Sequence, residues 1–121
     1  MSSDRKLLFV SALSGALSVA IGAFGAHGMD GEPAQWLATG GHYLMVHAAL
    51  AVAVALWSGA GKLGRVSGWV ALTGGLIFCL ALTTLALTGI RIMGAVAPIG
   101  GSLMIAGWVM LAIRAARGTK S

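Results

Sequence analysis

Long uncharged apolar stretches limit what this chain can fold into more than any other feature of its sequence. Asp, Glu, Lys and Arg are absent between Lys6 and Asp30, Glu32 and Lys62, Arg65 and Arg91, and Arg91 and Arg114. Each stretch supplies the roughly 20 residues that a helix needs to cross about 30 Å of hydrocarbon. The hydrophobicity is unbroken, without the alternation of a barrel strand. The sequence therefore predicts four transmembrane helices, over about residues 7–26, 41–58, 66–88 and 98–115.

Composition supports the same class. Hydrophobic side chains make up 58% of the 121 residues and charged ones 9%, with a mean hydropathy of +0.92, whereas soluble domains carry about 25% charge. Four spans leave no room for a separate soluble domain. We therefore predict an all-α fold, an integral membrane four-helix bundle in which residues 1–121 form one transmembrane domain. Cys79 is the only cysteine, so an internal disulfide is excluded.

The first stretch has one alternative interpretation. Arg5 and Lys6 precede it, and small residues over 23–26 resemble a cleavage site, as in a secretory signal peptide. The apolar run is longer than such a peptide uses. We therefore expect it to be a membrane span.

Two prolines predict where helices begin. Pro33 suits a first helical turn, which indicates a short interfacial turn through Gln35 and Trp36 before the second span. Pro98 is expected to open the fourth helix, because it lacks the N–H group that would be unpaired there.

The basic residues collect on one side of the predicted topology. Seven of the eight Lys and Arg lie on the side of the membrane that carries the two termini: Arg5, Lys6, Lys62, Arg65, Arg114, Arg117 and Lys120. Arg91 alone lies on the opposite side. The positive-inside rule then places both termini in the cytoplasm, in a multi-pass protein of the cell inner membrane. The sequence pI near 10.4 does not indicate nucleic-acid binding, because these cations lie at the ends of apolar runs. They are positioned to contact membrane lipids, and Arg91 to pair with Asp30, Glu32 or a lipid phosphate.

Small residues recur at four-residue spacing and predict helix-packing faces, because close approach drives helix association in lipid. One row lies in the first span and another in the fourth: Ser14, Ser18, Gly22 and Ala26; Gly94, Pro98, Ser102 and Ala106. With 19 glycines in the chain, membrane filler is the alternative. The set expected to pack helices is Ser14, Gly22, Phe24, Gly25, Pro98, Gly100 and Gly101.

His47 is the most informative single residue, because helix geometry puts it near the middle of the bilayer. An ionisable side chain there indicates a functional site and is expected to be neutral. It would relay a proton, bind a metal or contact a quinone-like headgroup; a purely structural interhelical hydrogen bond is the alternative. Its expected partners are Tyr43, one helical turn away, and Ser18, Thr83, Thr84 and Ser102.

The sequence gives little support for a metal site and none for a catalytic site. The histidines and carboxylates His27, Asp30, Glu32 and His42 are the types that hold zinc, but they match no specific ligand spacing. His42 and His47 are five residues apart, which turns them away from each other on a helix. We expect no metal or other cofactor and no enzymatic activity, since no catalytic motif is present.

Several motifs together resemble one family. They are Gly22-Ala-Phe-Gly-Ala-His27-Gly28, Tyr43, His47-Ala-Ala-Leu-Ala, Pro98-Ile-Gly-Gly101 and Gly107-Trp108. The chain resembles the DUF423 membrane proteins over nearly its whole length. The resemblance implies a four-span inner-membrane protein whose molecular role is not established. It also directs attention to the matching positions Phe24, Gly25, His27, Tyr43, His47, Pro98, Gly100 and Gly101.

The third span departs from the family pattern, which resembles Phe-Ser-Gly-Ser-Leu-Tyr, because this chain reads Phe78-Cys-Leu-Ala-Leu-Thr83. A site that needs those hydroxyl groups would have to use Thr83 or Thr84 instead. Taken together, the motif positions and the depth of the polar residues predict one polar or lipid-contact cluster. It consists of His27, His42, Tyr43, His47, Ser18 and Ser102.

Three functions remain open on the sequence. The favoured hypothesis is a non-catalytic accessory subunit or assembly factor that docks on a membrane-protein partner, or on a second copy of itself, through small-residue faces. The alternatives are a small proton-linked transporter or channel that uses His47, and a protein that binds a lipid or quinone headgroup.

Overall fold

The computed structural model describes residues 2–118 of the chain, and Lys120 lies outside them. The described residues form four α-helices and no strand: α1 (Ser3–Gly28), α2 (Gly31–Leu56), α3 (Gly61–Thr88) and α4 (Met93–Ala116). Each is long and apolar enough to cross a membrane, which confirms the predicted fold class. With 24 to 28 residues each, the helices are about 36–42 Å long and extend beyond a hydrocarbon core of about 30 Å.

The helices begin earlier than the apolar stretches alone indicate. The Ser2 hydroxyl caps α1 by accepting a hydrogen bond from the Arg5 amide at 3.2 Å, so the helix starts before the charged residues. Pro33 does lie in the first turn of α2, but this helix is continuous from Gly31 and has no separate interfacial turn. Gly40 and Gly41 do not interrupt it, because each packs against the backbone of a neighbouring helix.

The prediction for Pro98 is wrong, because α4 begins at Met93 and the proline lies inside it. Backbone hydrogen bonds from Met93 to Ile90 and from Ala95 and Val96 to Ile92 start the helix upstream. Proline at this position leaves only the carbonyl group of Gly94 without an intrahelical partner, within the exposed first turns.

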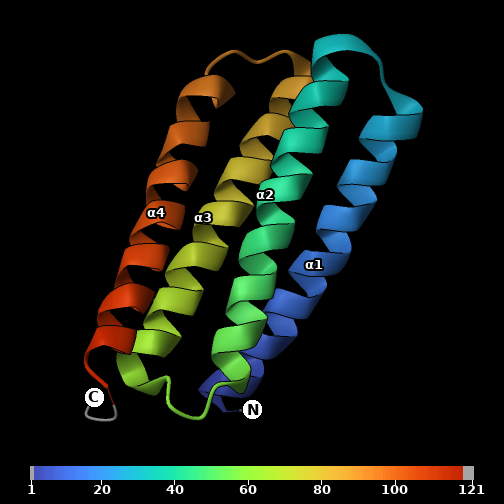
Figure 1. Cartoon of the computed structure of the whole chain (residues 1–121). Helices are drawn as coiled ribbons and strands as arrows, with labels where there is room; N and C mark the ends of the chain where they lie inside the picture. Colours follow the sequence, from blue (N-terminus) through green and yellow to red (C-terminus); the bar gives the residue numbers. More distant parts are fainter. Residues whose placement is uncertain (1, 119–121) are drawn as a thin grey trace.

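The helices alternate in direction and lie in a row in the order α1, α2, α3, α4 (Figure 1). Extensive contacts join α1 to α2, α2 to α3 and α3 to α4, and a smaller contact joins α1 to α3. The up-and-down bundle is therefore open rather than closed, because α4 does not return to α1. Both ends of the described chain lie at the same end as the α2–α3 connection, and the other two connections lie at the opposite end.

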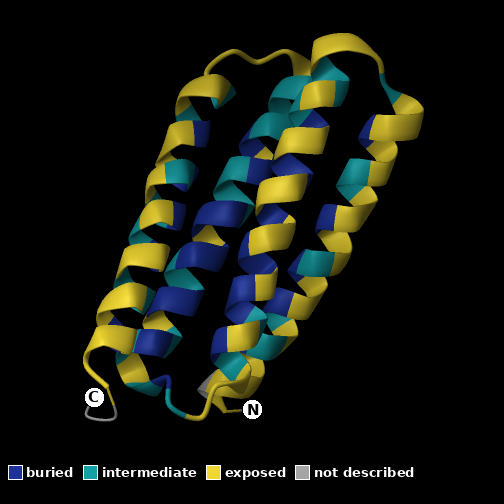
Figure 2. Ribbon diagram, viewed as in Figure 1, coloured by how far each residue is buried: buried dark blue, intermediate teal, exposed yellow. Residues whose placement is uncertain are grey.

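The buried residues lie mainly on the two central helices, whereas α1 and α4 are exposed over most of their surfaces (Figure 2). Large apolar side chains point outward all around the protein, as expected where hydrocarbon is the solvent. The core cluster is made of Leu7, Leu44, Ala48, Leu50, Ala51, Val54, Ala60, Ala71, Leu72 and Cys79.

Glycines set the closest helix contacts. Gly100 of α4 lies directly against α3, since a Cβ atom at this position would be 2.5 Å from the Phe78 amide nitrogen and 2.6 Å from the Gly74 carbonyl oxygen. A Cβ atom at Gly41 of α2 would be 3.0 Å from the Ser18 carbonyl oxygen of α1. These contacts explain why the neighbouring helices approach at backbone distance.

The predicted small-residue rows only partly face these contacts. In the first row Ser14 and Ser18 are buried, Gly22 is half-buried against Gly41, and Ala26 is exposed. In the fourth span the predicted row does not pack within the bundle, because Gly94, Pro98 and Ser102 are exposed and Ala106 is only half-buried; packing between copies stays a prediction. The face that packs on α3 is instead Ala97, Gly100, Met104, Gly107 and Arg114. Four-residue spacing alone did not indicate which face of α4 the neighbour would occupy.

Charged groups lie near the ends of the bundle. Within residues 2–118 one salt bridge is formed, between Arg65 Nε and Asp4 Oδ1 at 2.8 Å, and it joins the beginnings of α1 and α3. The expected pairing of Arg91 with Asp30 or Glu32 is not formed there. The short connections at that end keep Arg91 on the α3–α4 turn and Asp30 at the α1–α2 junction.

Candidate functional site

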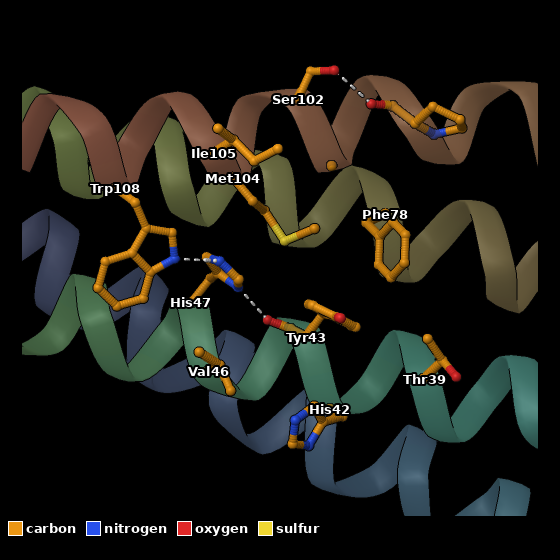
Figure 3. Close-up of a pocket in the computed structure, with 12 residues that line it drawn as sticks. Thr39, His42, Tyr43, Val46, His47, Phe78, Ser102, Met104, Ile105 and Trp108 are labelled. Carbon is orange, nitrogen blue, oxygen red and sulfur yellow. Dashed lines mark hydrogen bonds between the residues drawn. The ribbon is translucent and has the colours of Figure 1, made fainter.

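A groove of about 840 Å³ lies between α2 and α4, with α3 as its floor. It exists because these two helices both pack on α3 without packing extensively on each other. Aromatic, small and hydroxyl-bearing side chains line it (Figure 3): Thr39, His42, Tyr43, Val46, His47, Phe78, Pro98, Gly101, Ser102, Met104, Ile105 and Trp108. None of these side chains is an Asp, Glu, Lys or Arg.

His47 connects the two walls of the groove. The residue is 4% exposed, and the indole Nε1–H of Trp108 on α4 donates a hydrogen bond to His47 Nε2 at 3.0 Å (Figure 3). On the other side of the ring, Nδ1 lies 2.6 Å from the Tyr43 carbonyl oxygen. Since Nε2 accepts and a carbonyl oxygen can only accept, these contacts define a neutral imidazole with its proton on Nδ1. His47 is therefore a fully hydrogen-bonded bridge between α2 and α4.

Aromatic rings surround this bridge. The Tyr43 ring lies edge-on to Phe78 at a centroid distance of 5.2 Å and parallel to the His47 ring at 6.4 Å. Trp108 meets His47 edge to face at 6.0 Å, and His42 meets Tyr43 in the same way at 5.8 Å. Such offset and edge-to-face geometries are the favourable ones for aromatic pairs. The rings therefore form one continuous aromatic surface inside the groove.

The structure brings together only part of the predicted cluster. Four members of the predicted set line the groove: His42, Tyr43, His47 and Ser102. The other two members, Ser18 and His27, do not. Ser18 lies on α1 and donates to the Gly15 carbonyl oxygen at 2.6 Å. His27 is exposed at the end of α1. The two edge helices are too far apart in the row for α1 to reach this site.

The hydroxyl partners expected for His47 are also wrong. Ser102 donates to the Pro98 carbonyl oxygen at 2.9 Å, and Thr84 donates to that of Leu80 at 2.8 Å. Thr83 lies 3.9 Å from the Cys79 sulfur atom. Hydroxyl groups in apolar helices readily bond the carbonyl one turn back, and that local contact removes them as interhelical partners.

Sequence reasoning missed Trp108, although a signal was present. The other tryptophans lie near predicted membrane boundaries, whereas Trp108 lies well inside the fourth span. An indole N–H at hydrocarbon depth needs an acceptor, because no water is available there. The only ionisable residue at similar depth in another span was His47, so the pair was open to prediction.

The residues expected to pack helices divide into two groups. Ser14, Gly25 and Gly100 are buried at interfaces, and Gly22 is half-buried against Gly41. Phe24 is 51% exposed and covers Gly28 of its own helix, so it does not hold a neighbouring helix. Pro98 and Gly101 face the groove, where a Cβ atom at Gly101 would meet nothing within 4 Å.

A metal centre is not assembled in the part of the chain that the structure describes. No group of three or more His, Cys, Asp or Glu side chains comes together there. His42 and His47 do line one groove, but His47 already uses both ring nitrogens.

Arg114 is a second important residue that the sequence did not single out. The sequence predicts a cation at the membrane surface, yet Arg114 is only 2% exposed. Its guanidinium donates to the carbonyl oxygens of Gly59, Ala60 and Gly118 and lies 5.5 Å from the centre of the Trp57 ring. These contacts fasten the end of α4 to the α2–α3 connection.

These features define a small four-span helical membrane protein with a groove between two non-adjacent helices. The chain belongs to the DUF423 family, described as proteins of unknown function, whose model matches residues 21–101.

The curated relatives that it resembles are named UPF0382 membrane proteins. One from Staphylococcus haemolyticus is 39% identical over 114 residues, covering 90% of this chain and 93% of the relative. One from Haemophilus influenzae is 38% identical over 113 residues, covering 89% and 91%. YwdK of Bacillus subtilis is 36% identical over 120 residues, covering 93% and 98%. No solved structure matches the chain.

Proposed function

We propose that this protein is a non-catalytic accessory subunit or assembly factor of a larger membrane complex, and that it docks through the outward face of α1. This helix packs mainly on α2 and lies at the edge of the row (Figure 1). Its outward side carries exposed small residues at four-residue spacing, Ala12, Ala16 and Ala20. Such a face lets another helix approach closely in lipid, where packing rather than hydrophobicity drives association.

Two further observations support a docking role. The three carboxylates, Asp4, Asp30 and Glu32, lie at helix ends and outside the groove, so none of them is placed to act as an acid or base there. His47 uses both ring nitrogens in contacts with Tyr43 and Trp108, so its geometry favours a structural bridge over a proton carrier.

Affinity purification from native membranes tests the docking role. Tagged protein at native expression, extracted in mild detergent, is expected to carry a membrane-protein partner in a defined ratio. Ala16→Phe should lose that partner because the ring blocks close approach, whereas Ala112→Phe, an exposed alanine on α4, should retain it. A single monomeric species, or a dimer of this chain without another protein, would contradict the accessory role.

We also propose that the protein lies in the inner membrane with both termini in the cytoplasm. The support is the charge distribution, because Arg91 is the lone Lys or Arg at the end away from the termini among the described residues. Because the sole native cysteine is buried, introduced cysteines report topology cleanly. In intact cells a membrane-impermeant maleimide should label Glu32→Cys and leave Gly118→Cys unlabelled; the reverse pattern would invert the topology.

A further inference from the structure

We propose that the groove between α2 and α4 binds an isoprenoid quinone, with the ring inside the groove and the tail in the surrounding lipid. The inference goes beyond the docking role and uses a different surface, since α1 takes no part in the groove. Four properties of the groove carry it: its depth, its lack of charge, its aromatic surface and its closed inner end.

Depth and charge exclude an ionic headgroup. At about 1.5 Å per residue, Thr39 and His47 lie roughly 12 and 24 Å along α2 from Gly31, in a helix about 39 Å long. The inner end of the groove, at His47, therefore lies within the hydrocarbon depth of a bilayer, and Thr39 lies nearer its boundary. None of its lining residues is an Asp, Glu, Lys or Arg that would match an ammonium or a phosphate group. Its occupant is accordingly uncharged.

The end of the groove toward the chain termini is closed, which excludes a transmembrane helix as the occupant. Trp108 reaches across from α4 to His47 and separates the groove from a smaller cavity of about 290 Å³ that includes Leu50, Val54 and Trp57 (Figure 3). A partner helix would need a passage through the full thickness of the bilayer. A compact ring can enter from the side and needs no such passage. The groove volume of about 840 Å³ lies within the usual range of small-molecule sites.

The chemistry of the lining matches a flat ring with carbonyl oxygens. The rings of Tyr43, Phe78 and Trp108 offer faces and edges for stacking. The Tyr43 hydroxyl, the His42 ring and the Thr39 hydroxyl form no hydrogen bond with the other groove residues (Figure 3). These groups can donate to the two carbonyl acceptors of a quinone. The ring therefore has both a stacking surface and donors.

The open side of the groove provides the route for the tail. Val46 of α2 and Ile105 of α4 lie at its two edges and are both exposed, at 38% and 66%. A quinone moves laterally within the bilayer, so it would enter between these side chains without crossing water. The tail would then remain in contact with lipid.

Titration with a short-chain ubiquinone tests the proposal. The full-length protein in lipid nanodiscs free of quinone is titrated while tryptophan emission is recorded, because a ring beside Trp108 should quench it. Saturable quenching is expected. Gly101→Leu should weaken binding about tenfold or more, because its side chain would fill the groove. Gly94→Leu is the matched control: it lies on the same helix with nothing within 4 Å, outside the groove, and should bind as the wild type does.

Two further measurements keep the test decisive. Tyr43→Phe removes one hydroxyl donor and should weaken binding about threefold to tenfold without filling the groove. Geraniol, which has an isoprenoid tail without a quinone ring, should not compete. Absence of saturable binding, equal binding by Gly101→Leu with unchanged circular dichroism, or full competition by geraniol would each overturn the proposal. A partner retained by the Gly101→Leu variant would leave the docking role intact.

Discussion

Helix α4 is attached to its two neighbours in contrasting ways. Toward α3 it lies at backbone contact through Gly100, and at Gly107 only the Cβ atom of Ala71 lies between the two helices. Toward α2 it is separated by the groove, and the hydrogen bond between Trp108 and His47 spans the gap. One helix thus forms both the tightest interface of the protein and one wall of its most open region.

The difference shows what decides helix spacing in lipid. Apolar side chains gain nothing by leaving lipid for another helix, so close packing and polar contacts determine which helices associate. A missing side chain lets α3 and α4 meet directly. Across the groove the aromatic rings hold the helices apart, and a polar bond fixes the distance. The following variants test this contrast.

The largest effect is expected at the tight interface. Gly100→Leu should lower the free energy of unfolding by about 3 kcal/mol or more, because its Cβ atom alone would collide with backbone atoms of α3. Unfolding in SDS, monitored by circular dichroism, measures the change. Gly101→Leu is the adjacent control and should change stability by less than about 1 kcal/mol, since its side chain enters open space. Equal losses in both variants would contradict the assignment of the interface.

An intermediate effect is expected at the end of α4. Arg114→Met keeps an apolar stem but removes every donor, so the Gly59 carbonyl group loses this partner and the Ala60 carbonyl group keeps only its bond from the Gly64 amide. We expect a loss of about 2 kcal/mol in the same SDS assay. The exposed Arg117 is the matched position, and Arg117→Met should have little effect. A neutral Arg114→Met variant would show that the buried guanidinium does not fasten α4.

The smallest effect is expected at the bridge across the groove. Trp108→Phe removes the indole donor and keeps an aromatic ring, and it should cost about 1 kcal/mol. A double-mutant cycle with His47→Leu isolates the pair, because the coupling energy vanishes if the two residues do not interact. Coupling near zero would mean that the rings, and not the hydrogen bond, set the width of the groove.

Much of the fold was predictable because the bilayer imposes simple rules. Four uncharged stretches predicted four helices, since a backbone in lipid must bond within its own segment. The structure extends each helix beyond its apolar stretch, because caps such as Ser2 and turns such as Ile90–Ile92 act outside the hydrocarbon. The membrane orientation stays a prediction.

The candidate site was only half predictable. His47 stood out because an ionisable group in lipid is rare, and Tyr43 followed from helical spacing. Ser18 was grouped with them by depth, and His27 by depth and by the family motif. Depth along a helix does not reveal which helices are neighbours, so the open row that removes α1 from the site had no signature in the sequence. Ser102 reached the groove but bonds to its own helix.

The sequence by itself determined the number of helices, the membrane environment and the position of one unusual histidine, because each depends on local hydrophobicity. Tertiary structure alone decided that α4 packs on α3 and stands apart from α2, that Trp108 meets His47, and that Arg114 is buried on loop carbonyl groups. Those outcomes depend on which faces meet across helices, and in lipid that choice rests on the shapes of small side chains on both partners at once.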